Sequence, residues 1–329
     1  MSAEMGDGEP GHPKRVLLFT GGGGAATEAL YRLLGRRDEV HFADADVGAI
    51  PYALPAERWH QIPFALDPSF VDGLSRLCRQ LKVDLLIPGV DEELLPIASM
   101  REVIGCDVLL PPGDFIKIHL DKLASNSQLR AFGLPVPQTE RLSERSRISF
   151  PCIVKPSQGR GSHGVAIVRS EQELEAHIVT CRRRPEDFIL QELLCGQEYT
   201  VMMAADRSGG LRAVVPVKVG IKKGITLRAE TCRDDGVIAA CEAIHAANPV
   251  PGLYNIQLIK STAGDVKPFE INPRISTTAC LGLAAGVNFV DVYLEPTQGG
   301  NGPKNGRLPF RDGLGLKRSW HNDFLPRSS

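Results

Sequence analysis

The segment LYNIQLIKSTAGDVKPFEINPR, residues 253–274, decides how the second half of this chain folds. It contains two apolar stretches, LYNIQLIK (253–260) and DVKPFEINPR (265–274), on either side of the turn STAG. The pattern predicts a β-hairpin, because a glycine in a short polar connection suits a hairpin loop. A connection of six residues, 261 to 266, would place Gln257 opposite Glu270 in the antiparallel pair.

Side chains of this predicted hairpin gather oxygen ligands on one face. Alternate residues of a strand share a face, so Asn255 joins Gln257 on the first strand and Asn272 joins Glu270 on the second. One carboxylate and two amide oxygens suit Mg²⁺, which keeps several waters and also binds phosphate oxygens. Arg274 points the same way and offers a guanidinium to a phosphoryl group. The alternative is a solvated sheet face on which Glu270 pairs with a lysine.

A second motif, IVKPSQGRGSHGV (153–165), predicts a strand that runs into a glycine-rich loop. Lys155 lies beside buried apolar neighbours, where a lysine is seldom found without a partner. The glycines let backbone amides approach a phosphate, although the Walker pattern is absent and a flexible turn is the alternative. Lys122, in a predicted helical region at 114–132, is a second candidate phosphate ligand, but such lysines usually lie on the surface.

A third motif, ILQELLCGQEYTV (189–201), predicts a strand, a short hinge and another strand. At a strand edge, the free backbone groups of Gln191 to Leu194 could pair with adenine. Glu198 could accept hydrogen bonds from both ribose hydroxyls. A β-bulge with a surface glutamate is the alternative that the local sequence leaves open.

A glycine cluster near the start of the chain, LLFTGGGGAATEAL (17–30), raises the question of a dinucleotide. Gly21, Gly23 and Ala26 satisfy G-x-G-x-x-A. Asp44 or Asp46, about 20 residues later, could hold a ribose as the dinucleotide fingerprint expects. NAD chemistry also requires a hydride-transfer site, and the sequence offers none. NAD binding therefore stays a secondary hypothesis.

Strands and helices alternate in the first hundred residues, which predicts an α/β fold with a Rossmann-like parallel sheet. The predicted strands are RVLLFT (15–20), EVHFADAD (39–46) and DLLIPGVDEE (84–93), the last with a loop at its carboxyl end. The predicted helices are ALYRLLGRR (29–37) and FVDGLSRLCRQL (70–81). Later motifs indicate an α+β domain. The expected organisation is a disordered segment at 1–13, an α/β domain at 14–113, an α+β domain at 114–295 with a lid at about 123–190, and a loosely ordered tail at 296–329.

Composition excludes several classes of protein. A net charge of −1, from 38 basic and 39 acidic residues, leaves no electrostatic footprint for nucleic acid or an anionic membrane. No run of about 18 apolar residues could span a bilayer, and the start of the chain lacks the apolar stretch of a secretory signal. Eight cysteines without a C-x-x-C pair indicate reduced thiols in a cytoplasmic protein and predict no zinc site.

In chain order, Lys122, VKPSQGRGSHG, LQELLCGQEYTV, NIQ and FEINPRIS resemble the ATP-grasp superfamily. The resemblance covers roughly residues 111–291 and is closest to the branch of the carbamoyl phosphate synthetase large subunit and biotin carboxylase. The first 110 residues are consistent with a pre-ATP-grasp domain. The resemblance implies a two-subdomain ATP-grasp fold that holds ATP between its subdomains. The synthetase branch fuses two copies of this unit, whereas this chain has one.

The resemblance implies a role for each motif, with residues 158–164 as a mobile flap. It assigns nucleotide binding to Lys122, Lys155, Gly159, Gly161, Ser162, His163, Gln191, Glu192, Leu193, Leu194 and Glu198. It assigns Mg²⁺, for which Mn²⁺ can substitute, to Gln257, Glu270 and Asn272. It assigns catalytic contacts to Arg274, Lys222 and Arg228, and substrate contacts to Gly22, Gly23 and Ser276.

The implied activity is an ATP-dependent ligation. A small carboxylate such as an amino acid would be phosphorylated to an acylphosphate and captured by an amine, with release of ADP and Pi. The alternatives are a carbamoyl-phosphate-synthetase-like enzyme that forms a carboxy phosphate, and a non-catalytic nucleotide-binding protein. The implied partners are small molecules, and the family's habit of dimerising through its first domain allows a homodimer.

Overall fold

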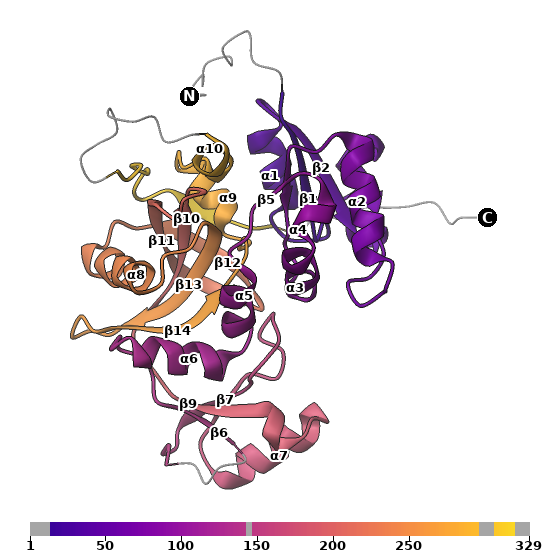
Figure 1. Cartoon of the computed structure of the whole chain (residues 1–329). Helices are drawn as coiled ribbons and strands as arrows, with labels where there is room; N and C mark the ends of the chain where they lie inside the picture. Colours follow the sequence, from indigo (N-terminus) through magenta and orange to yellow (C-terminus); the bar gives the residue numbers. More distant parts are fainter. Residues whose placement is uncertain (1–13, 143–146, 296–305, 320–329) are drawn as a thin grey trace. The chain divides into compact units, whose positions relative to one another are not determined.

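The computed structural model describes residues 14–142, 147–295 and 306–319 (Figure 1). The disorder expected at 1–13, and the parts of the expected tail at 296–305 and 320–329, lie outside the described residues. Contacts divide the chain into two compact units, and the boundary between them follows Leu109. Each unit has its own sheet structure and is described separately.

Unit 1 is built on a five-stranded parallel sheet with the strand order β3-β2-β1-β4-β5, as the alternation predicts. The strands are β1 (Val16–Thr20), β2 (Glu39–Asp44), β3 (Trp59–Gln61), β4 (Leu85–Ile87) and β5 (Asp107–Val108). The helices are α1 (Thr27–Leu34), α2 (Phe70–Leu81), α3 (Asp91–Ser99) and α4 (Arg101–Ile104), with short 3₁₀ turns at Val47–Ala49 and Ala56–Arg58. Strands β1 and β4 are buried, as expected of a parallel sheet in an α/β fold.

The segment 84–93 begins with the predicted strand, but the loop predicted at its carboxyl end gives way to a helix. Strand β4 ends at Ile87, and helix α3 begins at Asp91. The three acidic residues that open α3 lie in its first turn, where the positive end of the helix dipole stabilises them. The Pro-Gly pair at 88–89 supplies the break between the two elements.

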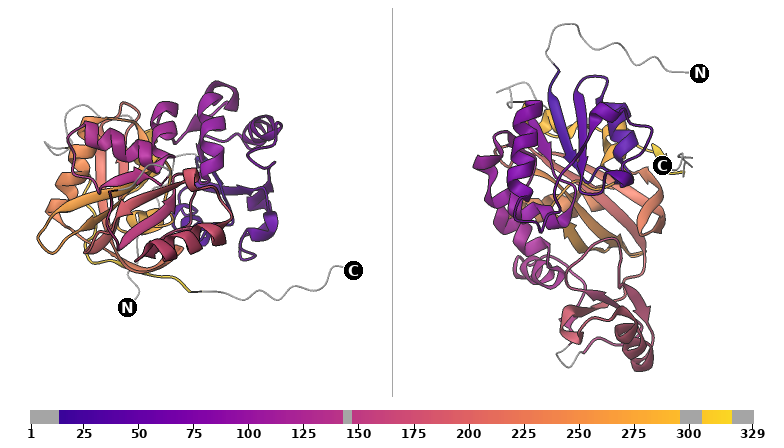
Figure 2. Two further views of the ribbon diagram at one scale, coloured as in Figure 1. Left: turned by 90° about the horizontal axis from the view of Figure 1, so that it is seen from below. Right: turned by 90° about the vertical axis from the view of Figure 1, so that its right-hand side faces the viewer.

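Unit 2 contains two antiparallel sheets. The smaller has the order β6-β9-β7-β8, with β6 (Thr139–Arg141), β7 (Cys152–Pro156), β8 (Ala166–Val168), β9 (Phe188–Glu192), helix α7 (Glu171–Cys181) and the 3₁₀ turn Pro185–Asp187. The larger has the order β14-β13-β10-β11-β12-β15, with β10 (Gln197–Ala205), β11 (Leu211–Lys223), β12 (Ile225–Thr231), β13 (Gly252–Lys260), β14 (Val266–Asn272) and β15 (Gly315–Lys317). The small sheet and α7 form a lobe apart from the large sheet (Figure 1, Figure 2).

Helices cover one face of the large sheet and leave part of the other face polar. The helices of unit 2 that remain are α5 (Gly113–His119), α6 (Lys122–Ala131), α8 (Asp235–Ala247), α9 (Ala279–Ala284) and α10 (Phe289–Leu294). Residues of α5, α6 and α8 pack against Tyr254, Ile256 and Leu258 of β13 in one core cluster. Because side chains alternate along a strand, Asn255 and Gln257 point to the opposite face.

Residues 306–318 are ordered, so the expectation of a loose tail is wrong for them. Strand β15 pairs antiparallel with β12, with Leu316 opposite Ala229. The Thr231 hydroxyl donates to the carbonyl oxygen of Arg311 at 2.7 Å and accepts from the amide of Leu314 at 2.9 Å. A three-residue strand with a distant partner leaves little periodicity in the sequence, which is why the pattern did not reveal it.

The helices and the cysteines can be compared with the expectations about membrane spans, disulfides and zinc. None of the helices in the described ranges is long and apolar enough to cross a membrane. All eight cysteines are free thiols. In the same ranges, no three His, Cys, Asp or Glu side chains are arranged to hold a metal ion together. The predicted magnesium site has one carboxylate and two amides, so it is not a group of that kind.

Candidate active site

The hairpin of β13 and β14 has the pairing that the sequence predicts. Gln257 lies opposite Glu270, and Asn255 lies opposite Asn272. The connection is one residue shorter than the six predicted, because β13 ends at Lys260 and β14 begins at Val266. A β-bulge restores the register, since Leu258 pairs with Pro268 and Phe269 is the extra residue.

Oxygen atoms of the predicted metal ligands face cationic side chains. The Nζ of Lys222 donates to Gln257 Oε1 at 2.9 Å, and the Nζ of Lys122 lies 3.2 Å from Glu270 Oε1. The Nδ2 of Asn272 donates to Asn255 at 3.3 Å, which leaves the Asn272 carbonyl oxygen as an acceptor. Hard oxygen donors gathered on one face are the ligands that Mg²⁺ prefers.

Lys155 is buried at the end of β7, with 4% of its surface exposed. Its Nζ donates to Gln191 Oε1 at 2.9 Å and to the carbonyl oxygen of Phe269 at 3.4 Å. Burial lowers the pKa of Lys155 to about 8, and the nearby Glu270 carboxylate partly opposes this shift. The carbonyl that receives this lysine belongs to the bulged residue of β14.

Positive charge exceeds negative charge in this cluster. Among the residues that the structure describes, Lys122, Lys155 and Lys222 interact with two carboxylates, those of Glu270 and Glu198. Glu198 accepts from Lys222 at 2.6 Å, so the predicted ribose ligand is paired with a lysine in this structure. A site with excess positive charge and low exposure attracts an anion such as a polyphosphate.

The glycine-rich loop after β7 closes one side of the cluster. The carbonyl oxygen of Gly159 accepts from the Nζ of Lys122 at 2.7 Å. Gly161 and Ser162 both have positive φ, at 67° and 59°. A Cβ added to Gly224 would lie 3.6 Å from the Gly161 carbonyl oxygen, so the loop approaches the β11–β12 turn. His163 is exposed in the same loop.

Of the four residues predicted to contact adenine, only the two that follow β9 have backbone groups without a partner among the described residues. Strand β9 lies between β6 and β7, so it is not the edge strand that the sequence suggested. The Gln191 side chain is buried and its Nε2 donates to Thr139 Oγ1 at 2.8 Å. Leu193 and Leu194 follow the strand, and the described part of the chain supplies no hydrogen bond to their backbone.

The Glu192 side chain is also used within the protein. Its carboxylate oxygens accept from the Nζ of Lys267 at 2.9 and 3.1 Å and from the amide of Gln138 at 3.0 Å. These contacts tie the small sheet to β14. Neither Gln191 nor Glu192 offers a side chain to a nucleotide in this arrangement. Their backbone is paired with the neighbouring strands and with Gln138, so the predicted backbone contact to adenine would fall to Leu193 and Leu194.

Arg274 and Ser276 follow directly after β14. The Arg274 Nη1 donates to the carbonyl oxygen of Ile275 at 3.1 Å, and its own carbonyl accepts from Asn255 Nδ2 at 3.1 Å. The hydroxyls of Ser276 and Thr278 lie 2.8 Å apart. Asn255 is 2% exposed and shapes this turn, a role that the alternation of the strand did not reveal.

The structure does not bring Arg228 to the cluster. The register across β10, β11 and β12 places Ala229, opposite Val219, on the face that carries Gln257. Arg228 therefore points to the other face, where it is exposed and lies opposite Lys317. Two bulges in β11–β12 turn Lys222 back towards Gln257. For this reason Lys222 and Arg228, both predicted to be catalytic, lie on opposite faces of the sheet.

Gly22 and Gly23 belong to unit 1, and their amides have protein acceptors. The amide of Gly22 donates to the carbonyl oxygen of Ala43 at 3.0 Å, and that of Gly23 donates to Asp44 Oδ2 at 2.9 Å. A Cβ on Gly23 would lie 2.6 Å from Ala49 Cβ, so packing alone accounts for this glycine. Their substrate contact stays a prediction. The Asp44 carboxylate accepts hydrogen bonds from the amides of Gly23 and Asp46 and so stabilises this loop, which leaves it poorly placed to bind the ribose of a dinucleotide.

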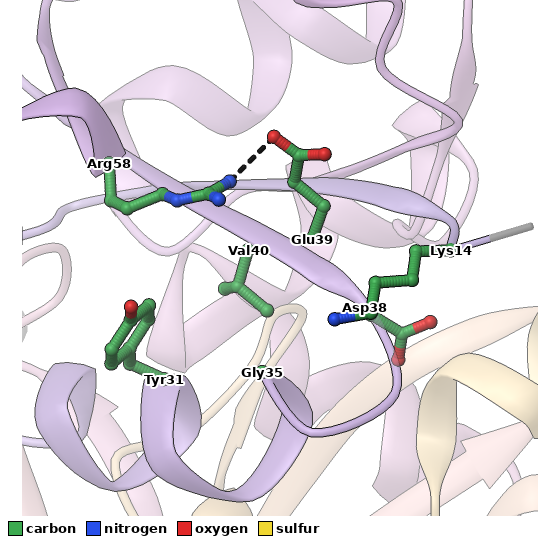
Figure 3. Close-up of a pocket in the computed structure, with 7 residues that line it drawn as sticks. All are labelled: Lys14, Tyr31, Gly35, Asp38, Glu39, Val40 and Arg58. Atoms are coloured by element: carbon green, nitrogen blue, oxygen red, sulfur yellow. Dashed lines mark hydrogen bonds and ion pairs between the residues drawn. The ribbon is translucent and has the colours of Figure 1, made fainter. Parts of the chain in front are cut away.

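Unit 1 also contains a pocket of about 230 Å³ at the start of β2 (Figure 3). Both of its carboxylates are paired, because Asp38 accepts from Arg15 at 2.7 Å and Glu39 accepts from Arg58 at 2.6 Å. None of the predicted site residues lines it. Ligands of parallel α/β sheets bind beyond the carboxyl ends of the strands, and this pocket lies at the amino end of β2.

Sequence comparison links the chain to known proteins. A family model described as ATP-grasp in the biosynthetic pathway with Ter operon matches residues 184–318. The formate-dependent phosphoribosylglycinamide formyltransferase of Bifidobacterium longum is 23% identical over 302 residues, which cover 82% of this chain and 74% of that protein. The D-alanine–D-alanine ligase of Geobacter sulfurreducens is 29% identical over 143 residues, which cover 40% of this chain and 45% of that protein.

Solved structures share the fold. An L-amino acid ligase from Bacillus licheniformis has a TM-score of 0.66 at 19% identity, over 85% of this chain and 73% of that one. The biotin carboxylase domain of a 2-oxoglutarate carboxylase from Hydrogenobacter thermophilus, a dimer in complex with MgADP, has a TM-score of 0.62 at 15% identity, over 85% and 69% of the two chains.

Proposed function

Because this chain has an ATP-grasp domain, we propose that it is an ATP-dependent ligase that joins a small carboxylate to an amine and releases ADP and Pi. One observation carries the proposal. Three lysines from separate elements converge on the β13–β14 hairpin face that bears Gln257 and Glu270. A low-dielectric cluster with excess positive charge beside hard oxygen ligands suits a magnesium–nucleotide complex.

In this proposal, Lys122 and Lys155 hold the phosphates of ATP. Within the described residues, no carboxylate lies within hydrogen-bond distance of the Lys155 ammonium, so a phosphate would supply the anion that it lacks. Lys222 would release Glu198 to the ribose hydroxyls and turn to the phosphates. The backbone of Leu193 and Leu194 would take the adenine edge, because Gln191 is buried behind them.

Gln257, Glu270 and Asn272 would hold Mg²⁺, with Mn²⁺ as a substitute because both ions prefer oxygen ligands in octahedral geometry. The ion neutralises the charge that develops on the β- and γ-phosphates. Lys122 and Lys222 now sit beside two of these ligands at 3.2 and 2.9 Å and would move aside.

The reaction needs positioning and charge stabilisation more than a strong base. A carboxylate oxygen of the substrate forms a bond to the γ-phosphorus as the bond to the ADP oxygen breaks, and an acylphosphate results. The amine nitrogen then bonds to the acyl carbon, the bond from that carbon to the phosphate oxygen breaks, and Pi leaves while the amine loses a proton. Arg274 stabilises the phosphoryl group in transfer.

A second candidate is an enzyme that forms a carboxy phosphate. A carbamoyl phosphate synthase large chain from Methanoculleus marisnigri is 24% identical over 67% of this chain, although the match covers only 23% of that protein. A non-catalytic nucleotide-binding protein is a third candidate, but the complete ligand set on β13 and β14 disfavours it. We further propose a cytoplasmic location, consistent with eight free thiols, and a homodimer.

The test is nucleotide turnover with Mg-ATP and a panel of amino and carboxylic acids, each with and without an added amine. ADP and Pi that depend on the carboxylate support acylphosphate chemistry, and an amine-dependent product supports ligation. Bicarbonate-dependent ADP would favour the second candidate. AMP and pyrophosphate would mean adenylation and would refute the proposal.

A further inference from the structure

The turn that carries Arg274 is fastened at two points. On one side, the Nδ2 of Asn255 donates to the Arg274 carbonyl oxygen at 3.1 Å. On the other side, the Nη2 of Arg318 donates to the carbonyl oxygen of Thr277. Arg274, the proposed phosphoryl ligand, therefore belongs to a turn that accepts one hydrogen bond from strand β13 and another from the C-terminal segment.

Arg318 also fastens the start of β12. Its backbone amide donates to the carbonyl oxygen of Leu227 at 2.9 Å, and its Nε donates to the carbonyl oxygen of Thr226 at 2.8 Å. A guanidinium presents its donors as a rigid planar fork, so one side chain can hold two backbone segments at a fixed spacing. Lysine has no such fork.

The setting of this arginine makes its contacts hard to replace. Thr226 is 5% exposed, and the half-buried Thr277 lies beside Thr278, which is 3% exposed, so water has limited access to the segments that Arg318 joins. A carbonyl that loses its donor in such a place carries a desolvation cost. Helix α9, which begins just after Thr277, packs Leu281 against Val217 and Ala229, so the turn and the sheet move together.

We propose that Arg318 is a positioning residue that sets the place of Arg274 through the turn 274–278. This inference rests on the proposed function, because it concerns the phosphoryl-transfer end of that site. In this way the C-terminal segment 306–318, which the sequence presents as a tail, takes part in positioning the active site. These hydrogen bonds of Arg318 reach the turn after β14 and the start of β12, not the nucleotide end around Lys155 and Leu194, so we expect nucleotide binding to be independent of Arg318.

The experiment compares Arg318→Gln and Arg318→Lys with the control Lys317→Gln. Lys317 is the neighbouring residue on β15 and is exposed. Its side chain makes no hydrogen bond or ion pair with the described residues, so the control removes the same charge one position away. Three quantities are measured: the affinity for Mg-ATP, kcat and KM for the carboxylate, and hydrogen exchange in a peptide that covers residues 274–280.

We expect R318Q to lower carboxylate-dependent turnover by about 10²-fold, the scale for a catalytic group displaced by about 1 Å. Affinity for Mg-ATP should stay within about threefold, and exchange at 274–280 should speed up. R318K keeps the charge without the fork and should be intermediate, while K317Q should match the wild type. R318K also serves as the folded variant if R318Q does not fold.

Two results would overturn the inference. Unchanged exchange at 274–280 in R318Q or R318K would show that the arginine does not hold the turn. An equal loss of activity in K317Q would show that surface charge, not position, is responsible. Hydrogen exchange does not require turnover, so faster exchange without any carboxylate-dependent ADP in the wild type would support the fastening and refute the proposed function instead.

Discussion

Lys122 and Glu270 form a partly buried ion pair, with 3.2 Å between Nζ and Oε1 and side-chain exposures of 9% and 18%. The pair joins the first residue of α6 to the β13–β14 hairpin. The sequence offers two interpretations of Glu270, a metal ligand or the partner of a lysine. The structure shows the lysine partner. The two interpretations are compatible, because in a complex with Mg-ATP Glu270 would bind Mg²⁺ and Lys122 would bind a phosphate.

Glu270→Gln should abolish magnesium-dependent turnover, because an amide is a much poorer magnesium ligand than a carboxylate. Lys122 would lose its partner, so binding of metal-free ATP should be unchanged or tighter. The measurement is ADP formation against magnesium concentration, together with ATP binding in EDTA. Glu230→Gln is the control, because Glu230 is exposed on β12 and its nearest ammonium, Lys218, is 3.6 Å away. A normal magnesium dependence in E270Q would remove Glu270 from the metal site.

Nucleotide affinity should fall as the pH rises above about 8, the pKa to which burial lowers Lys155. The ammonium form binds phosphate, so the phosphate raises this pKa in the complex and binding takes up a proton above pH 8. The Kd for Mg-ATP should then rise by up to about tenfold per pH unit until the pKa of the complex is reached. Titration calorimetry at several pH values measures it.

Lys155→Arg provides the control for this pH dependence, because arginine stays protonated over the whole range. Its affinity for Mg-ATP can be lower throughout, since the guanidinium is larger than the site of Lys155. It should not show the additional fall above pH 8. The same slope in both proteins would assign the titration to another group.

The hairpin of β13 and β14 was open to prediction because its signals are local. Alternation, a glycine in the turn and the spacing of Gln257 and Glu270 together gave the correct pairing. The bulge at Phe269 was not predictable, because an extra residue in one strand leaves no mark on composition. It nevertheless supplies the carbonyl oxygen that receives Lys155.

Most of the errors at the site come from partners in distant parts of the chain or from β-bulges. Strand β6 covers β9, so Gln191 is buried and not at an edge. Strand β15 covers β12, and Arg318 reaches the turn after β14. Two bulges in β11–β12 separate Lys222 from Arg228. Long-range pairing and bulges are set by tertiary packing, which a single sequence does not display.

Arg274 and Arg228 should behave differently on substitution, although the sequence presents both as catalytic. Arg274→Ala should lower turnover by about 10²-fold or more, the scale for loss of one preorganised charged donor. Arg228→Ala should change it by less than about threefold, because Arg228 is exposed on the opposite face of the sheet. Steady-state ADP formation compares them. A loss in R228A as large as in R274A would restore Arg228 to the site.

Gly196, in the hinge between β9 and β10, should tolerate no side chain. Its φ is +150°, and a Cβ there would collide with the carbonyl oxygen of Lys260 and lie 2.7 Å from its carbonyl carbon. The end of β13 has little freedom to move away, because Lys260 pairs with Gln197 and its Nζ donates to both oxygens of Asp234 at 2.7 Å. Gly196→Ala should therefore destabilise the fold by about 3 kcal/mol or more.

Gly264→Ala is the matched control, because Gly264 also has a positive φ, +95°, but its added Cβ would meet nothing within 4 Å. The control isolates the backbone cost of a left-handed residue, about 1–2 kcal/mol. Urea unfolding of both variants measures the difference, which is the cost of displacing Lys260. Because the hinge leads from Leu194 to Glu198, G196A should also weaken Mg-ATP binding and G264A should not. Equal destabilisation in the two variants would contradict this prediction, because it would mean that residue 196 and Lys260 can move apart at little cost in free energy.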